Sequence, residues 1–257
     1  MEYQPVKLFY EEEGKGFPVV LLHGFPLDHT IWQPVVPELA SKARLILPDL
    51  RGHGRSPVTD EMYTMRLLAE DIVALLDDLK IERAVVVGHS MGGYVSLAFA
   101  HAFPWRLAGL GLVATHAASD NPERRQGRYL MIEKIKRRGV LPLIKDMGTK
   151  LTINPELANQ LESIMMNTSP TGMINSLKGM AERTDMTQEL SSMDVPAVVI
   201  AGKEDPILPV EKARTTAQLL SKAWFVEVPQ AGHMPMLEAP RDVAAALLQL
   251  IEVASNT

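Results

Sequence analysis

The sequence predicts an α/β fold with a mostly parallel sheet that is covered by helices on both faces. Strand-like apolar runs alternate with helix-like stretches along the chain, which is the order that builds such sheets. Residues 68–79 and 243–251 each carry one apolar stripe at helical spacing, so both helices should pack on the sheet. The third observation is an apolar run over residues 84–87 that leads into a serine between two glycines.

This run reads Ala-Val-Val-Val-Gly-His-Ser-Met-Gly-Gly over residues 84–93. It stops at Ser90, between Gly88 and Gly92, which is typical of a turn so tight that only glycine fits on either side. Residues 94–102 are apolar or small, so we expect a helix to begin at the serine. The positive potential of that helix N-terminus makes Ser90 a candidate nucleophile.

Two further titratable residues follow predicted strands. Asp205 comes after an apolar run over 195–201, and His233 comes after another over 224–228. Both positions belong to the edge of the sheet where open α/β folds gather their sites. The chain order Ser, Asp, His is that of enzymes with a nucleophile elbow. A serine needs an imidazole to take its proton, and the imidazole needs a carboxylate to orient it, so this chemistry requires no metal and no cofactor.

Three segments carry a resemblance to a known family. They are Gly-His-Ser-Met-Gly at 88–92, Val-Leu-Leu-His-Gly-Phe at 20–25 and Asp-Leu-Arg-Gly-His-Gly-Arg-Ser at 49–56. Together they resemble the α/β-hydrolase superfamily, over nearly the whole length of the chain. Because the nucleophile is a serine, the branches that use an aspartate for the covalent step are excluded.

The resemblance implies a role for each residue. Ser90 would be the nucleophile, His233 the base and Asp205 the acid that orients it. The backbone N–H groups of Phe25 and Met91 would form the oxyanion hole.

The acid has two rivals. Asp120 lies just beyond the strand that corresponds to the sixth of the family, from which some relatives draw their acid, and Glu204 adjoins Asp205. Asp205 is preferred because the Gly-x-x-Asp-Pro arrangement at 202–206 matches the family pattern, with Pro206 stiffening the turn.

The middle of the chain differs from the rest. Strand patterns disappear over residues 115–194, and eight of the fourteen methionines lie there. We expect residues 1–114 and 195–257 to form the α/β-hydrolase core and 115–194 to form a small helical cap. Methionine fills irregular shapes, so some of these side chains should line the substrate pocket, although ordinary packing between short helices explains them equally well.

We expect the pocket to be lined by Pro26, Trp32, Met131, Met165 and Met234. Pro26 restricts the backbone of Phe25 and lacks an N–H, which could redirect the oxyanion donor and favour attack by peroxide. Stiffening of the turn is an equally good account of this proline.

Composition narrows the function. A net charge of −5 argues against nucleic acid as a partner, and the absence of cysteine excludes disulfides. Residues 1–5 resemble no secretion signal and no run is long enough to span a membrane, so we expect a cytoplasmic location. The oligomeric state is not encoded in any pattern that we recognise.

The sequence therefore predicts a serine hydrolase of small to medium carboxylic esters. Lactonase, perhydrolase and acyl thioesterase activities use the same acyl-enzyme and remain open alternatives. The basic stretch over 123–138 could receive an anionic substrate or an acyl carrier protein, but a solvated helix face is the simpler interpretation. A receptor that retains the triad is the alternative from another class.

Overall fold

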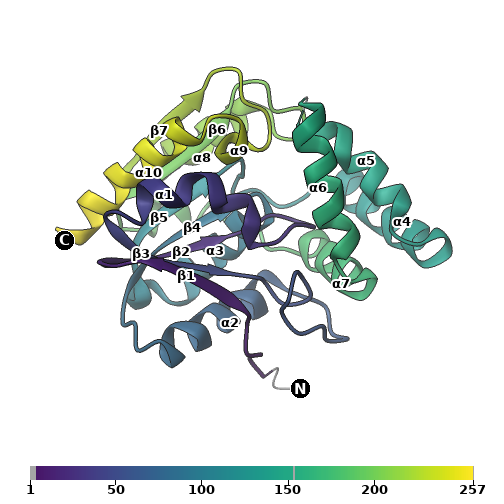
Figure 1. The fold of residues 1–257 in the computed structure, drawn as a ribbon, viewed down its shortest axis with the longest axis horizontal. Coiled ribbons are helices and arrows are strands. Elements are labelled where there is room, and N and C mark those ends of the chain that lie inside the picture. Colours follow the sequence, from purple (N-terminus) through teal and green to yellow (C-terminus); the bar gives the residue numbers. More distant parts are fainter. Residues whose placement is uncertain (1–3, 153, 257) are drawn as a thin grey trace.

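The computed structural model of the chain describes residues 4–152 and 154–256. Seven strands form one sheet (Figure 1): β1 (Tyr10–Gly14), β2 (Phe17–Leu22), β3 (Ala43–Pro48), β4 (Ala84–His89), β5 (Leu107–Val113), β6 (Ala197–Gly202) and β7 (Ala223–Val228). Their spatial order is β1-β3-β2-β4-β5-β6-β7. β1 pairs with β3 in the antiparallel sense, and the other neighbours are parallel. The mostly parallel sheet predicted from the sequence is confirmed.

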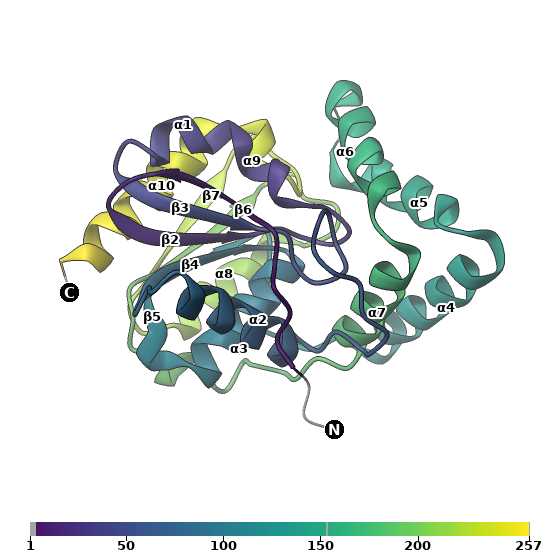
Figure 2. The ribbon, with the colours of Figure 1, turned by 60° about the horizontal axis from the view of Figure 1, so that its bottom comes forward.

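Helices cover both faces of the sheet (Figure 2). One face carries α2 (Met65–Asp78), α3 (Met91–Ala102) and α8 (Val210–Leu219), and the other carries α1 (Val36–Leu39) and α10 (Pro240–Ser255). The short helix α9 (Pro235–Glu238) precedes α10. Short 3₁₀ helices occupy His29–Val35, Pro104–Arg106 and Leu190–Ser192.

Alternation along the strands builds both cores. In β2, Val20 and Leu22 belong to the core beneath α2 and α3, whereas Val19 and Leu21 belong to the core beneath α1 and α10. All four side chains are fully buried, because successive side chains of a strand point to opposite faces and helices cover both.

Four helices lie between β5 and β6, and we call them the insertion helices. They are α4 (Pro122–Arg138), α5 (Leu141–Leu151), α6 (Pro155–Asn167) and α7 (Pro170–Ala181). They gather on one side of the sheet (Figures 1 and 2). The strand before them is the fifth of the described chain, whereas the family pattern led us to count it as the sixth.

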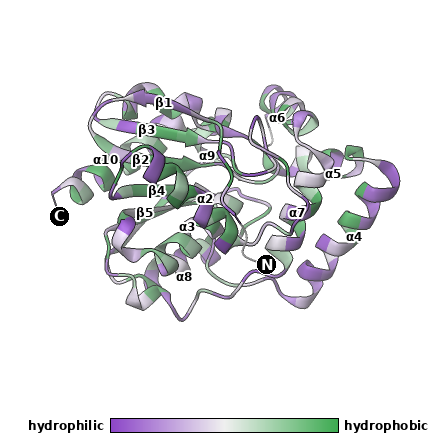
Figure 3. Ribbon diagram, turned by 90° about the horizontal axis from the view of Figure 1, so that it is seen from below, coloured by the Kyte–Doolittle hydropathy of each residue, from purple (hydrophilic) through white to green (hydrophobic). Residues whose placement is uncertain are grey.

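Local signals explain where these helices begin. Each has a proline in its first turn, where the missing N–H costs no helical hydrogen bond. The side chains of Asn121 and Asn154 cap α4 and α6. Figure 3 shows α4 as largely hydrophilic, and its buried residues are Ile132 and Ile135. Among the described residues, no helix is both long and apolar enough to cross a bilayer.

Candidate active site

Ser90 lies in a sharp turn between β4 and α3. Its φ of 50° and ψ of −111° form a backbone conformation that is rare for residues with a side chain. A Cβ on Gly88 would lie 2.2 Å from the carbonyl oxygen of Gly92, and one on Gly92 would lie 2.5 Å from that of Leu22. The two glycines are therefore needed for the turn to close.

The structure brings Ser90, His233 and Asp205 together. The Ser90 Oγ lies 3.0 Å from Nε2 of His233, and Nδ1 of His233 lies 2.7 Å from Oδ2 of Asp205. These three residues follow β4, β7 and β6, so the parallel strands deliver them to one edge of the sheet. The serine hydroxyl can pass its proton to the imidazole, and the carboxylate can stabilise the resulting cation.

Asp205 is fixed by its own turn. Its Oδ1 accepts hydrogen bonds from the backbone N–H groups of Ile207 and Leu208, at 2.8 and 2.9 Å, which leaves Oδ2 for the imidazole. The neighbouring Glu204 is exposed.

Asp120, the other rival for the acid, is surrounded by arginines. Arg128 donates to its carboxylate, Arg183 lies 2.7 Å away and Arg124 lies 3.4 Å away. Burial favours the neutral acid, but the Arg128 hydrogen bond and the nearby guanidinium charges hold the pKa of Asp120 below its ordinary value. The carboxylate of Asp120 thus balances part of a cationic cluster.

The loop after β2 lies against Ser90. A Cβ on Gly24 would lie 3.2 Å from that of Ser90, so the backbone at Gly24 and Phe25 is in close contact with the turn. Phe25 borders the same cavity as Ser90. Met91 is the first residue of α3, and N–H groups in the first turn have no partner within the helix. The Met91 N–H therefore lies next to Ser90 without a partner in its helix, and the loop that carries Phe25 lies beside it.

Three other histidines surround this loop and are buried. Burial lowers the pKa of His23, holds that of His89 well below its ordinary value and lowers that of His53 to about 3. The Nε2 of His23 accepts from the Leu50 N–H at 2.8 Å, so its Nδ1 donates to the Gly24 carbonyl at 2.9 Å. These rings are neutral parts of the scaffold.

A cavity of about 430 Å³ opens at Ser90 and His233, and we call it the substrate cavity. Its other lining residues are Phe25, Tyr94, Arg124, Gly127, Arg128, Met131, Leu143, Asp146, Met147, Lys150, Leu177, Met180, Pro206 and Ile207. Most of them belong to the insertion helices.

Of the five residues expected in the pocket, the structure places Met131 in this lining. Trp32, Met165 and Met234 are fully buried in the core on the α1 and α10 side, where they pack against other apolar side chains. Pro26 lies outside the described lining, and its carbonyl accepts a hydrogen bond from the Thr168 hydroxyl at 2.9 Å.

The charge of the lining corresponds to the interpretation of the basic stretch over 123–138 that the sequence analysis ranked second. Arg124, Arg128 and Lys150 are cationic, and Asp146 supplies one carboxylate, which lies 2.8 Å from Lys150. The basic run over 123–138 was the available signal, but only the fold shows that its first turns face the cavity.

Sequence reasoning missed Glu238. Its carboxylate accepts from the Gly232 N–H at 2.7 Å and from the Thr152 hydroxyl at 2.6 Å. It therefore connects the loop that carries His233 to the end of α5.

Asp28, His29 and Asp49 each have an atom that could bind a metal ion, and these three atoms lie within 4.8 Å of one another. Their hydrogen bonds already account for these atoms, since Asp28 caps the following turn and Asp49 accepts from the N–H and from Nδ1 of His29. Burial opposes the charged imidazole, but the Asp49 carboxylate raises the pKa of His29. We interpret this cluster as a support for the loops.

Comparisons with known proteins identify the family of the chain. The model of the alpha/beta hydrolase fold matches residues 18–240. The malate-bound structure of a thermophilic esterase from Thermogutta terrifontis is 36% identical, with a TM-score of 0.93 over 97% of this chain and 94% of that one. The 3-oxoadipate enol-lactonase 1 of Acinetobacter baylyi is 30% identical over 86% of this chain and 84% of the relative.

The bromoperoxidase of Bacillus anthracis shares the fold, with 21% identity and a TM-score of 0.87 over 97% of this chain and 96% of that one. The chain belongs to the α/β-hydrolase fold family and is similar to a small esterase of that family.

Proposed function

We propose that the protein is a serine hydrolase that cleaves small to medium carboxylic esters through an acyl-enzyme on Ser90. The observation that carries the proposal is the continuous hydrogen-bonded path from Ser90 Oγ through His233 to Asp205. Similarity to an esterase over nearly the full chain supports the same reaction class.

The reaction proceeds in two halves. His233 takes the proton of Ser90 as its Oγ attacks the ester carbonyl, and the oxyanion accepts from the N–H groups of Phe25 and Met91. His233 then protonates the leaving alcohol, and the acyl group stays on Ser90. A water molecule, deprotonated by His233, then attacks the acyl carbonyl. The bond to Ser90 Oγ breaks, His233 returns the proton to this oxygen, and the acid is released. Each oxyanion donor contributes roughly 3 to 4 kcal/mol.

The insertion helices act in this proposal as a cap that selects substrates. They supply most of the cavity lining beyond Ser90 and His233. An apolar wall from Leu143, Leu177 and Met180 suits an alkyl chain of modest length, because pockets for small molecules are mostly apolar with few polar groups.

A fluorophosphonate probe tests the nucleophile. We expect one covalent adduct, which mass spectrometry locates on Ser90, and none in Ser90→Ala. Hydrolysis of p-nitrophenyl butyrate should fall by several orders of magnitude in this variant, which differs by one hydroxyl. A labelled residue elsewhere, or full activity of Ser90→Ala, would overturn the assignment.

Lactone hydrolysis is the second candidate, and similarity to an enol-lactonase favours it. The same acyl-enzyme forms, except that the alcohol remains attached to the acyl group. A panel of esters, lactones and acyl thioesters of graded length ranks these substrates by kcat/KM.

Perhydrolysis is tested by the ratio of peracid to acid at rising peroxide concentration. This ratio should fall in Pro26→Leu if Pro26 favours attack by peroxide.

A receptor would give a single slow turnover with retained product, whereas we expect many fast turnovers.

A further inference from the structure

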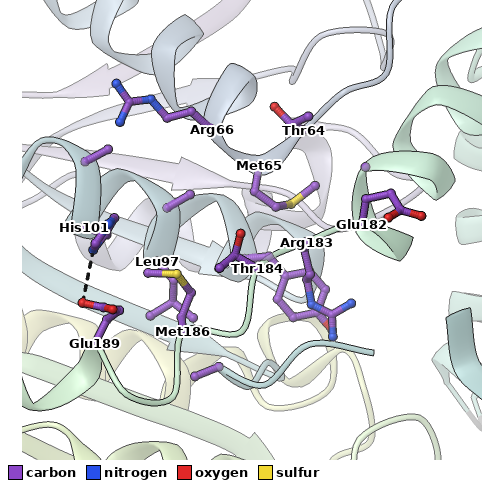
Figure 4. Close-up of a pocket in the computed structure, with 15 residues that line it drawn as sticks. Thr64, Met65, Arg66, Leu97, His101, Glu182, Arg183, Thr184, Met186 and Glu189 are labelled. Atoms are coloured by element: carbon purple, nitrogen blue, oxygen red, sulfur yellow. Dashed lines mark ion pairs between the residues drawn. The ribbon is translucent and has the colours of Figure 1, made fainter. Parts of the chain in front are cut away.

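A second cavity lies behind the substrate cavity. It has a volume of about 370 Å³, and residues of α2, α3 and the segment after α7 line it. Figure 4 shows Met65, Leu97 and Met186 in its middle, the His101 and Glu189 pair at one end and Arg183 at the other. We call it the back cavity.

Charged side chains stand at both ends of the back cavity. The His101 and Glu189 side chains, 3.7 Å apart, are 54% and 46% exposed, so that end faces solvent. At the other end, the Arg183 side chain is 3% exposed, whereas its neighbours Glu182 and Thr184 are exposed. Between the two ends the walls are mainly apolar, which suits a hydrocarbon chain.

Tyr94 borders both cavities and is the residue that their linings share. It is 7% exposed and lies in the first turn of α3, four residues after Ser90. Four residues of α-helix rise about 6 Å, so Tyr94 stands one turn from the nucleophile. Its ring therefore borders the substrate cavity close to Ser90.

The Tyr94 ring is held from two sides. The Arg183 guanidinium lies 4.1 Å from its centroid, and the His116 ring meets it edge-on at 5.7 Å. Arg183 is itself fixed by Asp120 and by the carbonyls of Met180 and Ala118. A guanidinium stacked on an aromatic face contributes attraction as well as packing, so the ring is a firm partition.

We propose that Tyr94 is a specificity-determining residue that limits the length of the acyl chain by closing the substrate cavity against the back cavity. The proposal rests on the proposed acyl-enzyme at Ser90. When the Tyr94 ring is removed, an unbranched acyl chain attached to Ser90 extends past position 94 toward Leu97 and Met186. The back cavity then binds the distal part of that chain.

The experiment compares kcat/KM for p-nitrophenyl dodecanoate with that for p-nitrophenyl butyrate. In Tyr94→Ala the ratio of the two should rise at least tenfold over the wild type. Tyr94→Phe keeps the ring and should leave the ratio unchanged. Tyr94→Val, which is a better packed replacement, should give the same direction of change if Tyr94→Ala proves too unstable to purify.

Two matched variants separate the partition from cavity volume. Met131→Ala enlarges the substrate cavity alone, and Met186→Ala enlarges the back cavity alone. Neither should raise the ratio as Tyr94→Ala does. An unchanged ratio in Tyr94→Ala and Tyr94→Val, or an equal rise in Met131→Ala, overturns the proposal.

Ester hydrolysis by the wild type tests the proposed function separately from the role of Tyr94. If it hydrolyses the butyrate ester and Ser90→Ala does not, a failure of the Tyr94 variants counts against the partition alone. If the wild type hydrolyses neither ester, the proposed function has failed instead.

Discussion

The Nε2 of His89 lies 2.8 Å from the backbone carbonyl oxygen of His233. His89 is buried and neutral, so this nitrogen carries the proton and donates it to the carbonyl. His89, the residue before Ser90, therefore holds the main chain of His233, which lies 144 residues further along the chain. The segments that follow β4 and β7 are therefore joined by this hydrogen bond as well as by the one between Ser90 and His233.

Loss of this bond should affect catalysis. We expect His89→Leu to lower kcat about tenfold with a smaller change in KM, because the imidazole of His233 is less well placed in the transition state. The unsatisfied carbonyl should also cost about 1 to 3 kcal/mol of stability. Steady-state kinetics and urea unfolding measure the two effects. His89→Gln retains a donor and should restore part of kcat, and equal kinetics in both variants would contradict this role.

Substitution of Asp205 and of Asp120, the two aspartates considered for the role of acid, should have different effects. Asp205→Asn removes the group that orients His233, and in a protease example this change lowers turnover by about four orders of magnitude. Asp120→Asn leaves three guanidinium groups without their carboxylate, so we expect a loss of about 3 to 5 kcal/mol in stability while kcat changes little. Kinetics at a temperature where both variants are folded distinguish them. A greater fall of kcat in Asp120→Asn would move the acid to that residue.

The lining charge predicts a preference for anionic substrates. Three cationic side chains and one carboxylate border the substrate cavity. The mono-p-nitrophenyl ester of adipic acid and p-nitrophenyl hexanoate have the same chain length and differ by one carboxylate. Arg124→Gln should lower the ratio of their kcat/KM values roughly fivefold, which corresponds to about 1 kcal/mol.

The same charge change on the exposed Arg137 of α4 is the control, and it should leave that ratio unchanged. Added salt should also lower the ratio in the wild type, because ions screen charges at an open cavity. A ratio that responds neither to Arg124→Gln nor to salt would show that these cations serve the fold alone.

The sequence was most informative where local geometry constrains the residue type. The turn at Ser90 requires glycine at 88 and 92, and strand ends at 205 and 233 follow from apolar runs, so these three positions could be predicted to converge. Pocket residues were harder, because apolar character does not tell which side of the sheet a side chain meets. For this reason Trp32 and Met165, which we expected in the pocket, lie instead in the core on the α1 and α10 side.

Contacts between distant segments were beyond sequence reasoning. Glu238 joins the His233 loop to Thr152, and Tyr94 separates two cavities, yet neither belongs to a motif. Both depend on how the insertion helices are placed, which is decided by tertiary packing rather than by periodicity. A basic helix such as α4 gives no sign in its sequence of which turns face a cavity.

His116 is a buried residue whose two ring nitrogens lack hydrogen-bond partners within the described part of the chain. Burial, aided by the charge of Arg183, lowers the pKa of its imidazole from 6.5 to about 3. Between these two values the unfolded chain binds the proton and the folded protein does not. Stability from this residue is therefore complete above pH 6.5 and is lost as the pH falls toward 3.

Between pH 7 and pH 5 His116 alone should lower the free energy of unfolding by about 2 kcal/mol. His116→Leu replaces the ring by an apolar side chain that needs no partner, so its stability should depend less steeply on pH and exceed that of the wild type at pH 5. Urea unfolding at pH 5, 6 and 7 measures both slopes, with His101→Leu at the surface as the matched loss of one histidine. Parallel slopes for His116→Leu and the wild type would mean that the folded protein protonates His116 in this range.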